Sequence, residues 1–173
     1  VAIIKHNNPC GCALGATPVD AYVKARATDP VSAFGGVIAF NRPVDLAAAK
    51  EITSTFVEVV IAPGFAEDAL AELKRKKDIR LLDVGPLSKA TAEGYDLKKL
   101  VGGLIVQDRD LGTIKDIKAL AVPTSRKPTE EEYAACAFAW VVCKHVKSNA
   151  IIYGRPGEIV GIGAGQMSRV DSV

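Results

Sequence analysis

"VIAFNRPVDLAAAKEITSTFVEVVIAPGF", residues 37–65, is the stretch that decides the fold expected for this chain. Its two short apolar runs, "VIAF" and "VVIA", are typical of buried strands. Between them, residues 46–56 repeat apolar side chains at helical spacing behind Asp45, a residue type that caps helices. Pro63-Gly64 then ends the second strand before another helical run over 65–77. Strand and helix therefore alternate, which indicates an α/β architecture.

The N-terminal side of this stretch continues the same alternation. Residues 1–4 predict a buried strand, and the segment 7–15, rich in Asn, Pro and Gly, predicts a turn. Thr17, Pro18 and Asp20 form a helix-start signature, because Thr caps, Pro suits the first turn and an acidic residue suits the helix dipole. This helix is expected to end near Thr28.

The C-terminal side adds strands at 79–84 and 103–110, then a long helix over 128–148. Thr129 and the three glutamates after it mark the start of that helix. Its middle is apolar on every face, so we expect a central helix that is buried on all sides. Residues 150–154 and 158–165 predict a hairpin, and a helix is expected to start near 167. Together these elements predict an α/β sandwich around a mixed sheet.

Composition bounds the class of protein. The 173 residues are 49% hydrophobic and 24% charged with a net charge of +2, which suits one globular domain and gives no sign of nucleic-acid or membrane binding. With no signal peptide, the four cysteines are expected to be reduced thiols in a cytoplasmic protein. The chain opens on Val1 in a strand and stops soon after the last helix start, so we expect a fragment of a longer polypeptide.

The glycine-rich run "GIGAGQ" (161–166) resembles a phosphate-binding loop, but its spacing fails. A dinucleotide fingerprint needs glycine where Gln166 or Ser168 stands, and no P-loop lysine follows. The run is still expected to bring Gln166, Ser168 and Arg169 to a helix N-terminus, where an anionic ligand is favoured.

Three other features have both a structural and a functional interpretation. Cys136 and Cys143 are expected to be apolar packing on the long helix, and His145 suits that helix's C-terminal dipole. Asn149 follows the predicted helix end, where Asn is a common cap, so capping and ligand binding both stay open.

A zinc site can be considered for His6 with Cys10 and Cys12. The C-x-C spacing is unusual for tetrahedral zinc, and no Cys-x-x-Cys occurs in the sequence. A zinc deaminase would need glutamate two residues after the histidine, and Asn8 stands there. The pattern therefore argues against a catalytic metal.

Lys5 and His6 stand together at the end of the first predicted strand. Neighbouring side chains on a strand point to opposite faces, so both can serve one site only if the strand has already ended. A histidine can accept a proton near neutral pH, and an ammonium can stabilise developing negative charge. From these residues alone, a surface dipeptide and an acid–base pair both stay open.

Five motifs occur together in an order that resembles a known family: "KHNNPCG" (5–11), "SAFGGVIAFN" (32–41), "FVEVVIAPGF" (56–65), "KSNAI" (147–151) and "VGIGAGQMSR" (160–169). The chain resembles the aminoimidazole carboxamide ribonucleotide (AICAR) transformylase part of bifunctional purine biosynthesis enzymes, over nearly all 173 residues. The resemblance implies a cytidine deaminase-like three-layer sandwich, with the chain as the first of two related subdomains. It also implies that the inosine monophosphate (IMP) cyclohydrolase domain and the second subdomain are absent from residues 1–173.

The activity implied is that of a phosphoribosylaminoimidazolecarboxamide formyltransferase, a transferase of one-carbon groups. The formyl group passes from 10-formyltetrahydrofolate to the 5-amino group of AICAR and gives FAICAR, without a catalytic metal. The resemblance also assigns roles to single residues of this sequence. The implied catalytic residues are Lys5, His6 and Asn149; the implied AICAR-binding residues are His6, Gly35, Glu58, Asn149 and Arg169; Val170 is implied at the folate pocket.

The family builds its site at a homodimer interface, and its phosphate-binding arginine region and a phenylalanine-bearing folate segment lie outside these 173 residues. We therefore expect the isolated chain to be inactive or nearly so. Two rival interpretations remain: a zinc-dependent, deaminase-like hydrolase and a noncatalytic nucleotide-binding module.

Overall fold

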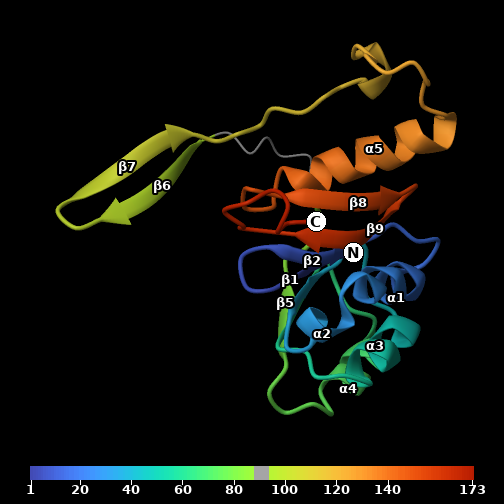
Figure 1. Ribbon diagram of the computed structural model, residues 1–173. Helices are drawn as coiled ribbons and strands as arrows, with labels where there is room; N and C mark the ends of the chain where they lie inside the picture. The colour runs from blue at the N-terminus through green and yellow to red at the C-terminus, as the bar shows by residue number, and fades with distance from the viewer. Residues whose placement is uncertain (88–93) are drawn as a thin grey trace.

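A five-stranded mixed sheet organises the N-terminal half of the chain in the computed structural model, which describes residues 1–87 and 94–173 (Figure 1). The strand order is β2 (Pro9–Cys12), β1 (Ala2–Ile4), β3 (Val37–Ala39), β4 (Val59–Ala62) and β5 (Arg80–Asp83). β1 is antiparallel to both of its neighbours, β2 and β3, whereas β3, β4 and β5 run parallel. The predicted α/β class and mixed sheet are confirmed.

Four helices connect these strands: α1 (Pro18–Thr28), α2 (Pro30–Ala33), α3 (Leu46–Thr53) and α4 (Glu67–Leu73). The predicted caps are present, since the Thr17 hydroxyl accepts from the Asp20 amide at 3.2 Å and the Asp45 carboxylate accepts from the Ala48 amide at 2.8 Å. Both α3 and α4 are shorter than the expected 46–56 and 65–77, because α3 ends in a cap at Ser54 and α4 in a cap at Lys74, and turns follow each cap before the next strand. The short α2, capped by Asp29, was not predicted.

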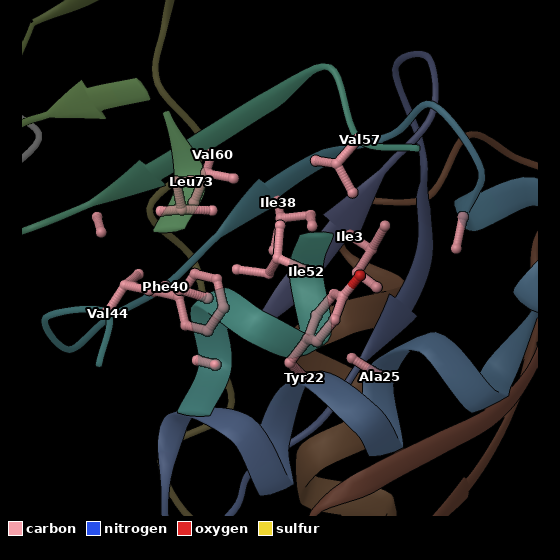
Figure 2. Close-up of a cluster of buried hydrophobic side chains, with 14 of the residues drawn as sticks. Ile3, Tyr22, Ala25, Ile38, Phe40, Val44, Ile52, Val57, Val60 and Leu73 are labelled. Atoms are coloured by element: carbon pink, nitrogen blue, oxygen red, sulfur yellow. The ribbon is translucent and has the colours of Figure 1, made fainter. Parts of the chain in front are cut away.

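The hydrophobic core lies between one face of the sheet and the helices α1, α3 and α4. Ile3, Ile38 and Val60 are aligned across three strands by register and are almost fully buried. They face Tyr22 of α1 and Ile52 of α3, as Figure 2 shows. Burial of large aliphatic and aromatic side chains of this kind is the main stabilising contribution to such a domain.

The opposite face of the sheet is also apolar but is only half-buried. Ile4, Val37 and Val59 form one row across it, and Leu82 in the next row is 43% exposed. Helices cover only one face of the sheet in the part of the chain that the structure describes. Two layers of the expected three-layer sandwich are therefore visible.

β2 corrects the predicted turn over 7–15. The turn is confined to the residues just before Pro9, after which the chain pairs back along β1. Gly11 permits this pairing, because a Cβ there would lie 1.9 Å from the Ala25 carbonyl oxygen of α1. A strand interrupted by Pro and Gly gave no alternating pattern by which it could be recognised.

The C-terminal half carries a projecting hairpin, an extended return segment and a helix on a second hairpin (Figure 1). The elements are β6 (Tyr95–Leu100), β7 (Gly103–Asp108), α5 (Glu130–Cys143), β8 (Ile151–Arg155) and β9 (Glu158–Gly163). The return segment contains the 3-10 helix η1 (Ile117–Ala119), and α5 has the capping box predicted at Thr129. The two hairpins are antiparallel, and α5 packs mainly against β8.

The predicted burial of α5 on all sides is wrong. Val142 is its buried residue, whereas Trp140 and Val141 are 53% and 52% exposed and Cys136 is also exposed. Only the side toward β8, β9 and η1 finds a packing partner among the described residues. The interpretation of Cys136 as interior packing is therefore also wrong.

The helix expected from about residue 167 is replaced by tight turns, in which the Ser172 amide donates to the Arg169 carbonyl at 3.2 Å. Gln166, Ser168 and Arg169 thus lie on a turn rather than at a helix N-terminus. Among the described helices, none has the combination of length and apolar sequence needed to cross a bilayer.

Candidate functional site

A cavity of about 250 Å³ opens at the edge of the sheet where β1 ends and β3 and β4 begin. Because β1 is antiparallel to β3, the residues after β1 meet the residues before β3 and β4 at this edge. We call it the Lys5–His6 cavity. Its lining residues are Ile4, Lys5, His6, Phe34, Gly35, Val37, Phe56 and Glu58.

Lys5 and His6 lie just beyond the last residue of β1, as the acid–base interpretation required. The Lys5 side chain is half-buried and its ammonium donates to the Phe34 carbonyl oxygen, whereas His6 is exposed at the cavity. The Lys5 amide donates to the Asn8 carbonyl at 2.8 Å and so closes the β1–β2 hairpin. Both side chains can therefore reach the same small volume from one turn.

Gly35 lies on the opposite wall with a positive φ of 70°, which favours glycine. Its amide donates to the Phe56 carbonyl at 2.8 Å, which joins the segment before β3 to the segment before β4. A Cβ at Gly35 would lie 3.3 Å from the Phe56 ring and 3.6 Å from the Lys5 Nζ atom. Because Gly35 has no side chain, its backbone can lie close to the Lys5 ammonium.

Glu58 supplies the carboxylate of the cavity. Its side chain is 51% exposed and lies 3.7 Å from the guanidinium of Arg80, on the neighbouring strand β5. An ion pair this open to solvent is weak, so the carboxylate remains available to accept hydrogen bonds from hydroxyl groups of a ligand.

A second cavity, of about 460 Å³, lies on the other side of Lys5. Lys5 lines both cavities, and the second is also lined by Asn8 and by Gln166 and Ser172 from the C-terminal turns. Lys5 is therefore the side chain shared by the N-terminal and C-terminal parts of the candidate site.

Asn149 organises the C-terminal part. Its amide donates to the Gln166 carbonyl at 3.1 Å and its side-chain amide to the Met167 carbonyl at 3.0 Å. The Ser172 hydroxyl donates to the Asn149 carbonyl at 3.1 Å. Since α5 ends at Cys143 with Lys144 as its cap, the capping interpretation of Asn149 is wrong.

Arg169 and Val170 line neither cavity. Both are exposed on the C-terminal turn, with Val170 82% exposed. Asn149 also lines neither cavity, although its partner residues Gln166 and Ser172 line the second. The structure therefore brings Lys5, His6, Gly35 and Glu58 together, and leaves Asn149, Arg169 and Val170 outside that cluster.

The cysteines near the cavity are poor candidates for metal ligation or nucleophilic chemistry. Burial raises the pKa of the Cys10 and Cys12 thiols above their usual value, which disfavours the thiolate that either role needs. Within residues 1–87 and 94–173, no group of three or more His, Cys, Asp or Glu side chains is placed to hold a metal ion.

Two aromatic residues of the cavity were missed by sequence reasoning. The rings of Phe34 and Phe56 lie 5.3 Å apart at 44° and remain substantially exposed. An exposed aromatic pair beside a lysine can contact the flat face of a ligand. Each phenylalanine stands in a motif next to a predicted site residue, but only the fold reveals that the two rings meet.

Lys144 occupies the cap of α5, and its ammonium donates to the carbonyl oxygens of Asp110 at 2.7 Å and Gly112 at 2.8 Å. It thereby fastens the return segment to the helix, away from the Lys5–His6 cavity. His145 follows it and is exposed.

The chain is thus an α/β domain with an open cavity at the edge of its sheet, in which Lys5, His6 and Glu58 stand among apolar residues. Comparison with known proteins shows its family. The family model described as "AICARFT/IMPCHase bienzyme" matches residues 1–173. The chain therefore belongs to the AICARFT/IMPCHase bienzyme family, and the resemblance seen in its motifs is confirmed.

Three relatives illustrate the match, and each is named a bifunctional purine biosynthesis protein PurH. The chain is 52% identical to the one from Anaeromyxobacter sp. (strain Fw109-5), with 99% of the chain and 34% of the relative covered. The identity is 55% to the protein from Rhodospirillum rubrum and 56% to that from Brucella ovis, with 99% of the chain and 32% of the relative covered in both. The chain thus spans about a third of the length of these relatives.

Proposed function

We propose that this chain supplies part of the site at which a bifunctional purine biosynthesis enzyme transfers a formyl group from 10-formyltetrahydrofolate to the 5-amino group of AICAR. The observation that carries the proposal is the convergence of Lys5, His6, Gly35 and Glu58 on one cavity from three separate segments. Membership of the AICARFT/IMPCHase family supplies the reaction class.

His6 is the general base in this proposal. The 5-amino nitrogen of AICAR attacks the formyl carbon, forms the new C–N bond and gives its proton to the imidazole. His6 suits this role because it is exposed at the cavity and can reach a ligand from the turn after β1.

Lys5 acts on the other side of the same reacting centre. The tetrahedral intermediate carries negative charge, which the ammonium stabilises, and its collapse breaks the bond to N10 of the folate, to which Lys5 assists proton delivery. Its Nζ atom already faces a carbonyl oxygen of the protein, Phe34 O, which shows that it can donate toward this part of the cavity. In the net reaction the formyl group moves from N10 of the folate to the 5-amino nitrogen of AICAR, and one proton leaves that nitrogen while one is delivered to N10.

The remaining predicted residues bind the two substrates. Glu58 accepts hydrogen bonds from the ribose hydroxyls, Gly35 contacts the nucleotide through its backbone, and Asn149 holds the carboxamide and the transferring group. Arg169 binds the nucleotide, and Val170 contacts the folate. Because Arg169 and Val170 are exposed here, their part of the proposal depends on the complete site.

The proposal extends to the full-length protein that contains this chain. In this proposal the full-length protein forms FAICAR in the cytoplasm as a homodimer, and a separate domain of it carries the IMP cyclohydrolase activity. The 173-residue chain is the first cytidine deaminase-like subdomain of the transformylase. Its partners are AICAR and 10-formyltetrahydrofolate, with no nucleic acid, membrane or catalytic metal involved.

The test is a formyl-transfer assay with AICAR and 10-formyltetrahydrofolate on the full-length protein that contains this chain. We expect His6→Ala to lower kcat by about 10²- to 10⁴-fold, the usual contribution of a general base, with AICAR binding largely kept. His145→Ala is the matched control, because His145 is the only other histidine of the sequence and is exposed away from the cavity.

Unchanged turnover in His6→Ala would contradict the catalytic role of His6 and favour the interpretation that this chain is a noncatalytic nucleotide-binding module within the full-length protein. Metal analysis of the same preparation addresses the other rival. Stoichiometric zinc that is lost when His6 or the nearby cysteines are replaced would favour a deaminase-like hydrolase.

A further inference from the structure

One side-chain hydrogen bond joins the two parts of the candidate site. The Lys147 amide donates to the Asn8 Oδ1 atom at 2.8 Å, across 139 residues of sequence. A backbone amide can only donate, so the Asn8 atom that faces it must be the carbonyl oxygen of the side chain. Asn8 itself lies in the turn after β1, and its own carbonyl accepts from the Lys5 amide at 2.8 Å.

The other end of this bond leads directly to Asn149. The Lys147 carbonyl accepts from the Gly165 amide at 2.8 Å, and the Asn149 amide donates to the Gln166 carbonyl at 3.1 Å. The segment before β8 is therefore bonded to the C-terminal turns on one side and to Asn8 on the other. The Asn8 side chain is thus a direct link between this segment and the turn that carries Lys5.

The bond itself is exposed, but the residues on both sides of it are held in place. Asn8 is half-buried, is followed by the buried strand residue Pro9, and lines the second cavity together with Lys5. Val146, just before Lys147, is 8% exposed and anchors the segment on its other side. A half-buried amide with a single geometric partner can fix a distance between two segments without contacting a ligand.

We propose that Asn8 is a positioning residue, which sets the distance between the Lys5–His6 turn and the Asn149 segment. The inference rests on the proposed formyl transfer, since that reaction needs Lys5, His6 and Asn149 at one substrate. Misplacing reacting groups by about 1 Å can cost up to roughly 10²-fold in rate. Loss of the Asn8 acceptor therefore lowers kcat, while Gly35 and Glu58, the AICAR-binding groups on the other segments of the Lys5–His6 cavity, stay in place.

Two substitutions of similar size separate the acceptor from the shape of the side chain. Asn8→Leu removes the oxygen, whereas Asn8→Asp keeps an oxygen that can accept from the Lys147 amide. Asn7→Ala is the matched control, because Asn7 is the exposed neighbour in the same turn. All variants are made in the full-length protein and assayed with AICAR and 10-formyltetrahydrofolate at saturating and limiting concentrations.

The expected result is a fall in kcat of about tenfold for Asn8→Leu, comparable with the loss of one hydrogen bond, with the KM for AICAR changed by less than about twofold. Asn8→Asp recovers most of this loss, and Asn7→Ala behaves like the parent. The pH dependence of kcat keeps the same shape in Asn8→Leu, because the proton-transfer groups are unchanged.

Thermal unfolding of each variant separates positioning from folding. If Asn8→Leu does not fold, Asn8→Ala replaces it in the same comparison. A kcat in the variant without an acceptor that equals the parent's, or an equal loss in Asn8→Asp, would overturn the inference. Absence of formyl transfer in the parent protein would instead contradict the proposed function, so the two failures are distinguishable.

Discussion

Gly35 is the residue whose backbone most tightly constrains the candidate site. Its φ of 70° lies in the left-handed region, which costs a residue with a side chain about 1–2 kcal/mol. We predict that Gly35→Ala in the full-length protein raises the KM for AICAR by about tenfold, since a methyl group would also press on Phe56 and approach Lys5. Steady-state kinetics at varied AICAR concentration measure the effect.

Gly85→Ala is the control for the cost of a side chain at positive φ without new side-chain contacts. Gly85 has a φ of 66°, close to that of Gly35, but a Cβ there would meet nothing within 4 Å. The same KM change in both variants would mean that the contacts with Phe56 and Lys5 contribute nothing.

Glu132 gives a pH-dependent prediction. The side-chain hydrogen bond from Arg126, and the one from the Thr129 amide, lower the pKa of Glu132 from 4.5 to about 2. A carboxyl group whose pKa is lowered by folding stabilises the folded state at pH values above its pKa in the unfolded chain. This contribution is lost as the pH falls from 4.5 toward about 2. We therefore expect protection of the first turn of α5 against amide hydrogen exchange to weaken over this interval, after correction for intrinsic rates.

Glu132→Gln should flatten that pH dependence, because the paired charge is gone. Glu131→Gln removes a neighbouring charge of the same helix turn but leaves the Arg126 pair, so it should keep most of the pH dependence. Equal flattening in both variants would show that the helix dipole, rather than the Arg126 pair, dominates.

The candidate site could be predicted from sequence only in part, and the reason is visible at single residues. Lys5 and His6 were recognisable because their chemistry and the strand end are local features. Their meeting with Gly35 and Glu58 depends on the register of β1, β3 and β4, which no local pattern encodes. The resemblance to a family supplied that convergence, whereas Asn8 gave no signal before its partner Lys147 was seen.

At the scale of elements, the helices with side-chain caps were the most predictable. Thr17, Asp45 and Thr129 each accept a backbone hydrogen bond where the sequence placed a helix start. β2 and β6 were missed, because β2 contains Pro and Gly and because β6, "YDLKKL", pairs only with β7 in the projecting hairpin. Strand formation depends on a partner, so a strand's own residues specify it less well than a helix's residues specify a helix.

The close approach of β2 to α1 gives the prediction at this scale. Gly11→Ala would place a methyl group 1.9 Å from the Ala25 carbonyl oxygen, a backbone atom that cannot move without shifting α1. We expect destabilisation of about 3 kcal/mol or more, seen as a lower thermal midpoint and a lower soluble yield. Gly103→Ala in β7 is the control, since a Cβ there meets nothing within 4 Å. Equal midpoints for the two variants would show that β2 can move away from α1 at little cost.

At the scale of the whole molecule, the composition of a segment did not predict how much of it is covered. α5 is as apolar as a central helix, yet Trp140 is 53% exposed, and the second face of the sheet is half-buried with Leu82 43% exposed. Burial depends on what surrounds an element, and apolar sequence states only what could be buried. The chain covers about a third of the length of its relatives, so these surfaces are those of one part of such proteins.

The last prediction follows from the fact that the chain covers only about a third of the length of its relatives. The isolated 173-residue chain should show little or no formyl transfer, because Arg169 and Val170 stand in solvent and the Lys5–His6 cavity, at about 250 Å³, is small for a nucleotide and a folate together. Its open apolar surfaces should also bind a hydrophobic dye more strongly than the full-length protein does, per mole of chain. Circular dichroism that shows a folded α/β chain is the necessary control. Robust formyl transfer by that folded chain would show that the described residues already form a complete site.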